Sequence, residues 1–208
     1  MRGVDATVVK LGGSYAFSRA LRSWIDAVAA CAGRVVLAPG GGPFAETVRT
    51  AQRKMGFDDR AAHEMALLAM EQYGRALINL GKGLTLAASA TAIRRVLRTG
   101  GVPVWSATAM VRAAEDIPCS WEVTSDSLAA WLAGRIGAPR VLLVKHLEPQ
   151  AGRLHAADLV ADGVVDPAFP RFLRASGAQA FIAGPGGHAS AASALRNGGI
   201  VGSAIELG

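Results

Sequence analysis

A lysine and two glycines follow one another near the start of the chain, at the end of an apolar run. The run covers residues 7–11, contains Lys10 and leads into Gly12, Gly13 and Ser14. Glycines let backbone N–H groups approach a phosphate closely, and the N-terminus of a following helix favours negative charge. Lys10 would add a positive charge where negative charge builds up during phosphoryl transfer. The segment is a candidate phosphate site, although a Gly-Gly turn at such a place can also be purely structural.

A second glycine turn follows the next apolar run, residues 34–38. It contains three consecutive glycines, Gly40, Gly41 and Gly42, between two prolines. Consecutive glycines lose much backbone entropy on folding, so a bound ligand is a reasonable explanation for them. The alternative is an awkward tight turn with no ligand.

A third candidate segment, residues 124–127, reads Thr-Ser-Asp-Ser and precedes an alanine-rich helix. Asp126 would bring a carboxylate to the end of the sheet where parallel folds place their chemistry. Ser and Asp are also favoured at helix N-termini for structural reasons, so an ordinary N-cap is the alternative here.

The elements that must position these segments alternate between short apolar runs and stretches of helical spacing. The expected strands are residues 7–11, 34–38, 102–105, 140–145, 180–183 and 200–205. The expected helices are residues 15–32, 44–55, 58–80, 89–100, 125–136, 167–176 and 190–196. No clear period is visible between 146 and 163. This alternation predicts an α/β fold, a three-layer α/β/α sandwich around a mostly parallel sheet, in a single domain over 1–208.

The charge pattern argues against a nucleic-acid partner. The formal net charge is +6, but the basic residues are dispersed along the 208 residues. Arg94, Arg95 and Arg98 come nearest to a patch, and they are expected on the solvated face of one helix. A mild positive field would instead help to attract phosphorylated substrates.

A cytoplasmic protein is expected from the remaining composition. No apolar run approaches the ~20 residues that a membrane-spanning helix needs, so no membrane partner is predicted. The first residues show no signal-peptide pattern. Cys31 and Cys119 lie far apart in sequence and are expected to be reduced thiols.

The order of the three candidate segments resembles the amino-acid-kinase family, which includes acetylglutamate, aspartate and uridylate kinases. The resemblance is carried by VVKLGGS, VVLAPGGGPFAE and TSDSLAAWLAGRIGAPRVLLVK, and it covers nearly the whole chain. It implies the amino-acid-kinase fold, ATP as phosphoryl donor, Mg²⁺ held mainly by the ATP phosphates, and a homo-oligomer. No ligand spacing for a protein-bound metal is present among the four histidines.

Three further segments, AHEMALLAMEQYG, SWEVTSDSLAAWLA and VVDPAF, resemble a short branch of that family, the kinases of methanofuran biosynthesis. The acceptor in that branch is an aminomethylfuran methyl phosphate, so it is itself a phosphate. The resemblance therefore implies an ATP-dependent kinase that phosphorylates a small phosphorylated metabolite.

The resemblance also implies roles for individual residues. Lys10 would stabilise the transferring phosphoryl group, and Asp126 would orient that lysine. The residues expected at the nucleotide are Gly12, Gly13, Ser14 and Lys145.

A separate set of residues is expected to contact the acceptor. Gly41 and Gly42 match the family's acceptor glycines, and Thr124 stands in the third segment. His63 is a candidate contact because of its place in AHEMALLAM, although a lone helical histidine is more often structural. Trp121 could line the acceptor pocket, although tryptophans are more often core residues.

The sequence departs from the family after the run 140–145. An acidic, glycine-containing turn is expected there. Residues 145–150 of this chain read Lys-His-Leu-Glu-Pro-Gln instead, with His146 and Pro149 in place of that turn. This departure favours an alternative, a non-catalytic protein that binds a nucleotide or oxyanion on the same fold. A carboxylate kinase of the acetylglutamate or aspartate kinase type is a further alternative, because variable loops select the acceptor.

Overall fold

The computed structural model describes residues 3–146, 148–149 and 154–208. These residues form one eight-stranded sheet in the order β3-β4-β2-β1-β5-β7-β8-β6. Among the pairs of neighbouring strands, β7 and β8 run antiparallel and the other pairs run parallel. The prediction of an α/β fold with a mostly parallel sheet is confirmed. The strands are β1 (Thr7–Leu11), β2 (Val35–Pro39), β3 (Leu84–Ala87), β4 (Val102–Trp105), β5 (Arg140–Val144), β6 (Leu154–His155), β7 (Gln179–Ala183) and β8 (Ser203–Glu206).

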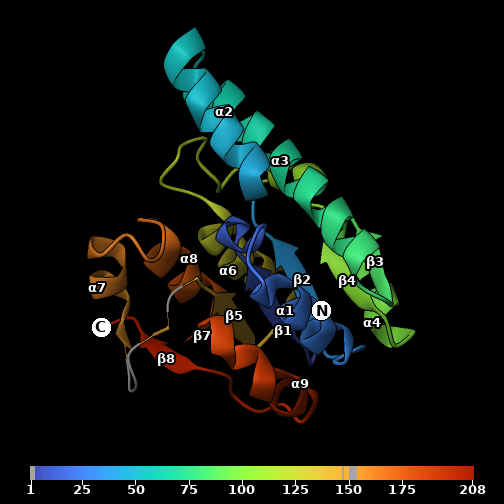
Figure 1. Ribbon diagram of the computed structural model, residues 1–208. Coiled ribbons are helices and arrows are strands. Elements are labelled where there is room, and N and C mark those ends of the chain that lie inside the picture. Colours follow the sequence, from blue (N-terminus) through green and yellow to red (C-terminus); the bar gives the residue numbers. More distant parts are fainter. Residues whose placement is uncertain (1–2, 147, 150–153) are drawn as a thin grey trace.

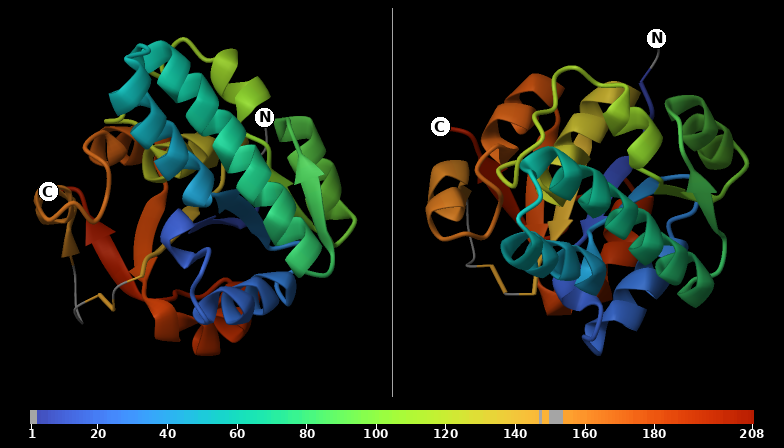
Figure 2. Two further views of the ribbon diagram at one scale, coloured as in Figure 1. Left: turned by 45° about the horizontal axis from the view of Figure 1, so that its top comes forward. Right: turned by 90° about the horizontal axis from the view of Figure 1, so that it is seen from above.

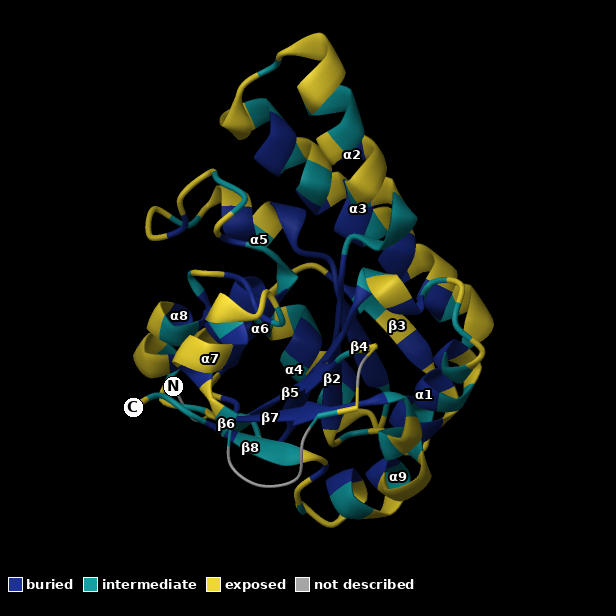
Figure 3. Cartoon of the chain, turned by 60° about the vertical axis from the view of Figure 1, so that its left-hand side comes forward, coloured by how far each residue is buried: buried dark blue, intermediate teal, exposed yellow. Residues whose placement is uncertain are grey.

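Helices cover both faces of this sheet (Figures 1 and 2). They are α1 (Ala20–Ala29), α2 (Gly42–Met55), α3 (Asp59–Leu80), α4 (Ala90–Arg98), α5 (Thr108–Arg112), α6 (Ser125–Ile136), α7 (Ala156–Ala161), α8 (Phe169–Ser176) and α9 (His188–Arg196), with short 3-10 turns η1 (Gly13–Tyr15) and η2 (Pro185–Gly187). One core cluster joins the sheet to α4, α6 and α8, and a second joins it to α1 and α9. Strands β1, β2, β4, β5 and β7 are almost entirely buried, whereas β3, β6 and β8 are partly exposed (Figure 3).

Helices α2 and α3 form an antiparallel pair that extends beyond the sheet (Figure 1). The sequence explains where α3 begins, because the Asp58 side chain accepts a hydrogen bond from the Ala61 amide at 2.8 Å, as an N-cap does. Gly56, with φ of 75°, ends α2 in the left-handed conformation that glycine adopts easily. The end of α2 and the start of α3 therefore lie where the sequence predicts, whereas α2 begins two residues earlier, at Gly42. The inner face of the pair can line a site above the sheet.

Side-chain alternation aims both candidate lysines at α6. Val8 of β1 packs in the cluster under α6, whereas Val9 packs in the cluster on the other face. Successive side chains of a strand point to opposite faces, so Lys10 points the same way as Val8. On the neighbouring strand β5, Leu143 faces α6, and Lys145 follows two residues later. The period of two thus brings two lysines of adjacent strands under the same helix.

The glycine turns after β1 and β2 pack directly against each other. A Cβ atom on Gly13 would lie 2.5 Å from the amide nitrogen of Gly42, and one on Gly40 would lie 2.8 Å from the amide nitrogen of Gly13. Gly42 also has φ of 60°, in the left-handed region that favours glycine. Backbone contact between the two turns therefore explains part of the glycine pattern without any ligand.

The structure corrects the sequence prediction in several short segments. The expected helix 15–32 is shortened to α1, because Tyr15 is buried and its hydroxyl donates to the Lys145 carbonyl at 2.7 Å. Phe17, expected on the apolar face of that helix, is 89% exposed. The prediction missed β3, α5, β6 and α7, which have four, five, two and six residues and are too short to show a period.

We expect Gly13→Ala to lower the free energy of unfolding by about 1–3 kcal/mol, because the added methyl group would collide with backbone that cannot move aside. Chemical denaturation monitored by circular dichroism measures this change. Ser14→Ala is the matched control, since it removes only a hydroxyl from the neighbouring residue. Equal stability of the two variants would contradict the close packing of the turns.

Candidate active site

Two lysines share one buried carboxylate at the carboxyl edge of the sheet. Lys10 Nζ lies 2.9 Å from Asp126 Oδ1, and Lys145 Nζ lies 2.6 Å from Asp126 Oδ2. The side chains of Lys10, Lys145 and Asp126 are only 7%, 13% and 5% exposed. The three residues come from β1, the end of β5 and the first turn of α6. We call this group the Lys-Asp-Lys cluster.

The cluster carries an excess positive charge when both lysines are protonated, because two ammonium groups face one carboxylate. Burial by itself would raise the pKa of Asp126, but the charges of Lys10 and Lys145 outweigh burial and lower that pKa. A buried charge without a partner is costly in free energy, so the site favours the arrival of an anion. A phosphoryl group is an anion of this kind.

The surroundings of Lys145 make its protonated form less favourable and so lower its pKa. Burial, together with the like charge of Lys10, lowers the pKa of Lys145 to about 8, although Asp126 opposes the shift. Asp166 acts in the same direction as Asp126, since its negative charge also favours the protonated lysine. Lys145 therefore titrates within the range in which enzymes are assayed.

The N-terminus of α6 is held by Asp166, a residue to which the sequence analysis gave no role. Its carboxylate accepts hydrogen bonds from the amide and hydroxyl of Thr124, at 3.0 and 2.8 Å, and from the amide of Ser127 at 3.0 Å and the Ser127 hydroxyl. Thr124 is the N-cap of α6 but makes no capping hydrogen bond with its own side chain. Asp166, 42 residues further along the chain, thus performs the capping in its place.

Because Asp166 caps α6, the interpretation of Asp126 as an ordinary helix cap is not needed. The Asp126 carboxylate is directed at the two lysines and not at its own helix N-terminus. Burial and the neighbouring charge of Asp126 raise the pKa of Asp166, and the hydrogen bonds from Ser127 and Thr124 oppose that rise. Asp166 is thus a positioning residue, because it fixes the helix end on which Asp126 stands.

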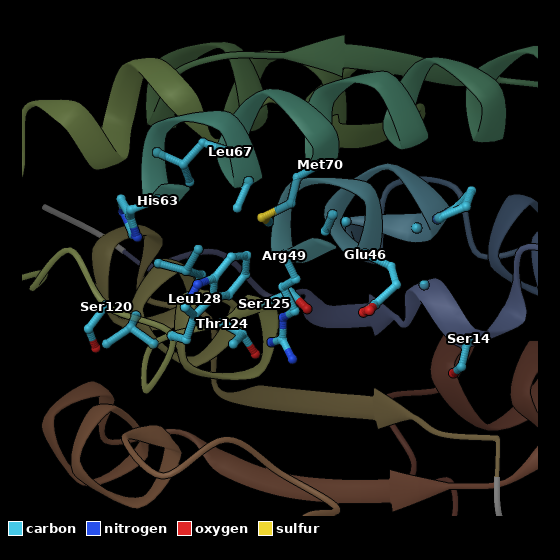
Figure 4. Close-up of a pocket in the computed structure, with 18 of the residues that line it drawn as sticks. Ser14, Glu46, Arg49, His63, Leu67, Met70, Ser120, Thr124, Ser125 and Leu128 are labelled. Atoms are coloured by element: carbon cyan, nitrogen blue, oxygen red, sulfur yellow. The ribbon is translucent and has the colours of Figure 1, made fainter. Parts of the chain in front are cut away.

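A pocket of about 440 Å³ opens beside the cluster. Figure 4 shows His63, Leu67 and Met70 of α3 on one side, and Thr124 and Ser125 on the other. The two glycine turns complete it with Gly13, Ser14, Gly41 and Gly42. The pocket therefore lies between the α2–α3 pair, the start of α6 and the glycine turns.

The surface of the pocket is mainly apolar, and a few charged side chains also line it. Arg49 of α2 also lines it, and its guanidinium carbon stacks 4.4 Å from the ring centre of Trp121. Trp121 is fixed by a hydrogen bond from its Nε1 to Gln52 at 2.7 Å. The acidic residues Glu46 and Asp59 also line the pocket. An arginine stacked on an aromatic ring offers a fork of donors suited to a phosphate or carboxylate.

The residues that the sequence singled out fall into two groups. Lys10, Asp126 and Lys145 meet in the cluster, whereas Gly13, Ser14, Gly41, Gly42, His63 and Thr124 line the pocket. Gly12 joins the groups, because a Cβ on it would lie 3.2 Å from Lys10 Nζ. Burial lowers the pKa of His63 and so favours its neutral imidazole. Lys145, which the family resemblance implies at the nucleotide, contacts Asp126 in the cluster.

The turn that departs from the family pattern is described only in part. Residues 147 and 150 lie outside the described residues. Glu148 accepts a hydrogen bond from the Gly186 amide at 2.7 Å, so it connects this turn to the glycine turn before α9. Within the described parts of the chain, no three His, Cys, Asp or Glu side chains are grouped to hold a metal ion. None of the helices described there is long and apolar enough to cross a membrane.

Most of the chain matches a known protein family. Residues 5–148 match the model of the amino acid kinase family. The chain belongs to this family. The match includes β1, β2, α6 and β5, and so all three members of the Lys-Asp-Lys cluster.

Relatives of this amino acid kinase family member are distant in sequence. One is the (5-(aminomethyl)furan-3-yl)methyl phosphate kinase of Methanocaldococcus jannaschii, which is 21% identical over 84% of this chain and 86% of the relative. Among solved structures, the uridylate kinase of Archaeoglobus fulgidus has a TM-score of 0.70 at 19% identity, over 97% of this chain and 100% of that one. The UMP kinase of Bacillus anthracis has a TM-score of 0.69 at 14% identity, over 99% and 97% of the two chains. The structural likeness confirms the amino-acid-kinase fold.

We expect Asp166→Asn to destabilise the protein by about 2 kcal/mol or more, because an amide cannot accept from all the donors that the carboxylate satisfies. Thermal and chemical denaturation measure the loss. Asp162→Asn is the matched control, since Asp162 is exposed and lies in the same segment. Equal effects of the two substitutions would contradict the capping role of Asp166.

Proposed function

We propose that this chain is an ATP-dependent kinase that transfers the γ-phosphoryl group to a small phosphorylated metabolite. The Lys-Asp-Lys cluster is the observation that carries the proposal. Phosphoryl transfer needs positioning and charge neutralisation more than covalent chemistry, and the cluster offers a fixed excess of positive charge. Lys10 and Lys145 are the proposed catalytic cations, and Asp126 is the residue that holds them in place.

The glycine turn after β1 is the proposed site of the ATP phosphates. Gly12 lies against Lys10 Nζ, and the backbone of Gly13 and Ser14 opens toward the pocket. The proposed nucleotide-binding residues are Gly12, Gly13, Ser14 and Lys145. Both oxygens of Asp126 already face lysines, so this carboxylate is poorly suited to Mg²⁺. The ion fits better as a companion of the ATP phosphates, which are hard oxygen ligands.

The pocket described above is the proposed acceptor site. Arg49 offers a guanidinium to an anionic group, and Trp121, Leu67 and Met70 give a surface for a flat apolar body. Gly41, Gly42, His63 and Thr124 are the other proposed acceptor contacts. An aminomethylfuran methyl phosphate combines an anionic group, a flat ring and an amine, and the amine would find a carboxylate at Glu46 or Asp59. The name of the Methanocaldococcus relative supports this acceptor as the first to test.

Two alternatives remain on the same fold. A non-catalytic protein that holds a nucleotide or oxyanion is favoured by the turn after β5, which lacks the family's acidic pattern. A carboxylate kinase would use the same cluster with a different acceptor. Turnover separates the first alternative from the proposal, and the identity of the phosphorylated product separates the second.

We also propose that the chain forms a homo-oligomer. Met65 and Leu68 lie one helical turn apart on α3 and are 39% and 44% exposed. An outward apolar stripe of this kind supports the homo-oligomer that the family resemblance implies.

We expect the chain with Mg-ATP to phosphorylate an acceptor, and Lys10→Met to lower kcat by at least about 100-fold without unfolding the protein. The assay follows ADP release and product mass with the aminomethylfuran phosphate, UMP and acetylglutamate as acceptors. Lys82→Met is the matched control, because Lys82 is exposed in the turn after α3. ATP binding without turnover on any acceptor would favour the binding protein, and unchanged kcat in Lys10→Met would refute the role of Lys10.

We expect kcat/KM to fall as the pH rises through about 8, the value to which burial and Lys10 lower the pKa of Lys145. The protonated form of Lys145 supplies the excess charge, so activity is present below that pKa and is lost above it. Lys145→Arg keeps its charge at all these pH values and should abolish the decline. A decline that is unchanged in Lys145→Arg would show that another group titrates.

A further inference from the structure

A second pocket, of about 560 Å³, lies at the opposite edge of the sheet from the Lys-Asp-Lys cluster. Its walls come from the residues before β1, the residues before β2 and one side of α4. Parallel strands place their amino ends on one edge and their carboxyl ends on the other. The pocket is therefore about 16 Å, one strand length, from the proposed catalytic centre.

Among the described residues, three arginines and one aspartate are the charged residues that line this pocket: Arg34, Arg94, Arg98 and Asp5. Arg34 forms an ion pair with Asp5, so these two charges cancel. Arg94 and Arg98 stand one turn apart on α4, and neither forms an ion pair with any described residue. The pocket thus keeps two uncompensated guanidinium groups side by side.

Arg94 also carries a hydrogen-bond donor that is unsatisfied among the described residues. Its Nη2 donates to the carbonyl of Ile136 at 3.3 Å, in the last turn of α6. Its Nε atom is buried and has no hydrogen-bond partner among the described residues. Buried donors are nearly always satisfied, and an orphaned one often marks an ion or water that belongs at the site.

We propose that this pocket binds a small phosphate monoester or inorganic phosphate. Two unpaired guanidinium groups match the charge and the oxygen geometry of a phosphate dianion. Val4 and Leu97 add apolar walls that would contact the organic part of a monoester. The site is separate from the acceptor pocket and does not depend on the proposed kinase activity.

The test is an NMR titration of the full chain with inorganic phosphate and, separately, with phenyl phosphate. Backbone amides of residues 3–5 and 91–98 should shift saturably, and Arg98→Gln should weaken that binding by about tenfold or more, as expected for a lost charge-assisted hydrogen bond. Arg95→Gln is the matched control, because Arg95 is exposed on the same helix but does not line the pocket. If phenyl phosphate binds more tightly than inorganic phosphate, the site is assigned to a monoester. If the two bind equally well, the site is assigned to the free phosphate ion.

Two results would overturn the proposal. Shifts confined to residues 12–14 would show that phosphate binds only at the glycine turn after β1. Equal weakening by Arg95→Gln and Arg98→Gln would show a diffuse effect of net charge instead of a site.

Discussion

The fold brings two buried lysines onto one carboxylate, and the arrangement of the other elements follows from this constraint. Burying Lys10 and Lys145 without Asp126 would leave two ammonium groups uncompensated in the protein interior, which costs several kcal/mol per charge. Asp126 can serve both only because β1 and β5 are neighbours and α6 begins above their ends. The central position of these two strands and the placement of α6 are therefore requirements of the site as well as of the core.

The helix that carries Asp126 is itself fixed from a distance. Asp166 binds the first turn of α6 through the amides and hydroxyls of Thr124 and Ser127, and its charge also acts on Lys145. Two acidic groups and two lysines lie within this buried network, and among the described residues only the Asp126 carboxylate forms ion pairs with the lysines. Such a network is stiff when every member is satisfied, and stiffness is what the positioning of a transferring phosphoryl group demands.

Much of this site could be predicted from sequence because it depends on local patterns. Lys10 precedes a Gly-Gly turn at the end of an apolar run, and Asp126 stands in the Thr-Ser-Asp-Ser segment before a helix, so both were identified as candidates. Lys145 was identified as well, but its partner was not, since pairing with Asp126 depends on which strands become neighbours. Asp166 received no role, because its capping of α6 crosses 42 residues and has no local signal. The short strands β3 and β6 were missed for a similar reason, as edge strands held by their neighbours rather than by a pattern of their own.

We infer that the Lys-Asp-Lys cluster holds an excess positive charge that a phosphoryl group neutralises. The most direct test is an NMR titration of the Lys145 side chain, with and without a saturating, non-hydrolysable Mg-ATP analogue. We expect a Lys145 pKa of about 8 in the free protein and a clear rise of that pKa with the nucleotide, because a nearby phosphate favours the protonated amine. A Lys145 pKa that the nucleotide leaves unchanged, or that already lies near 10.5 in the free protein, would contradict the inference.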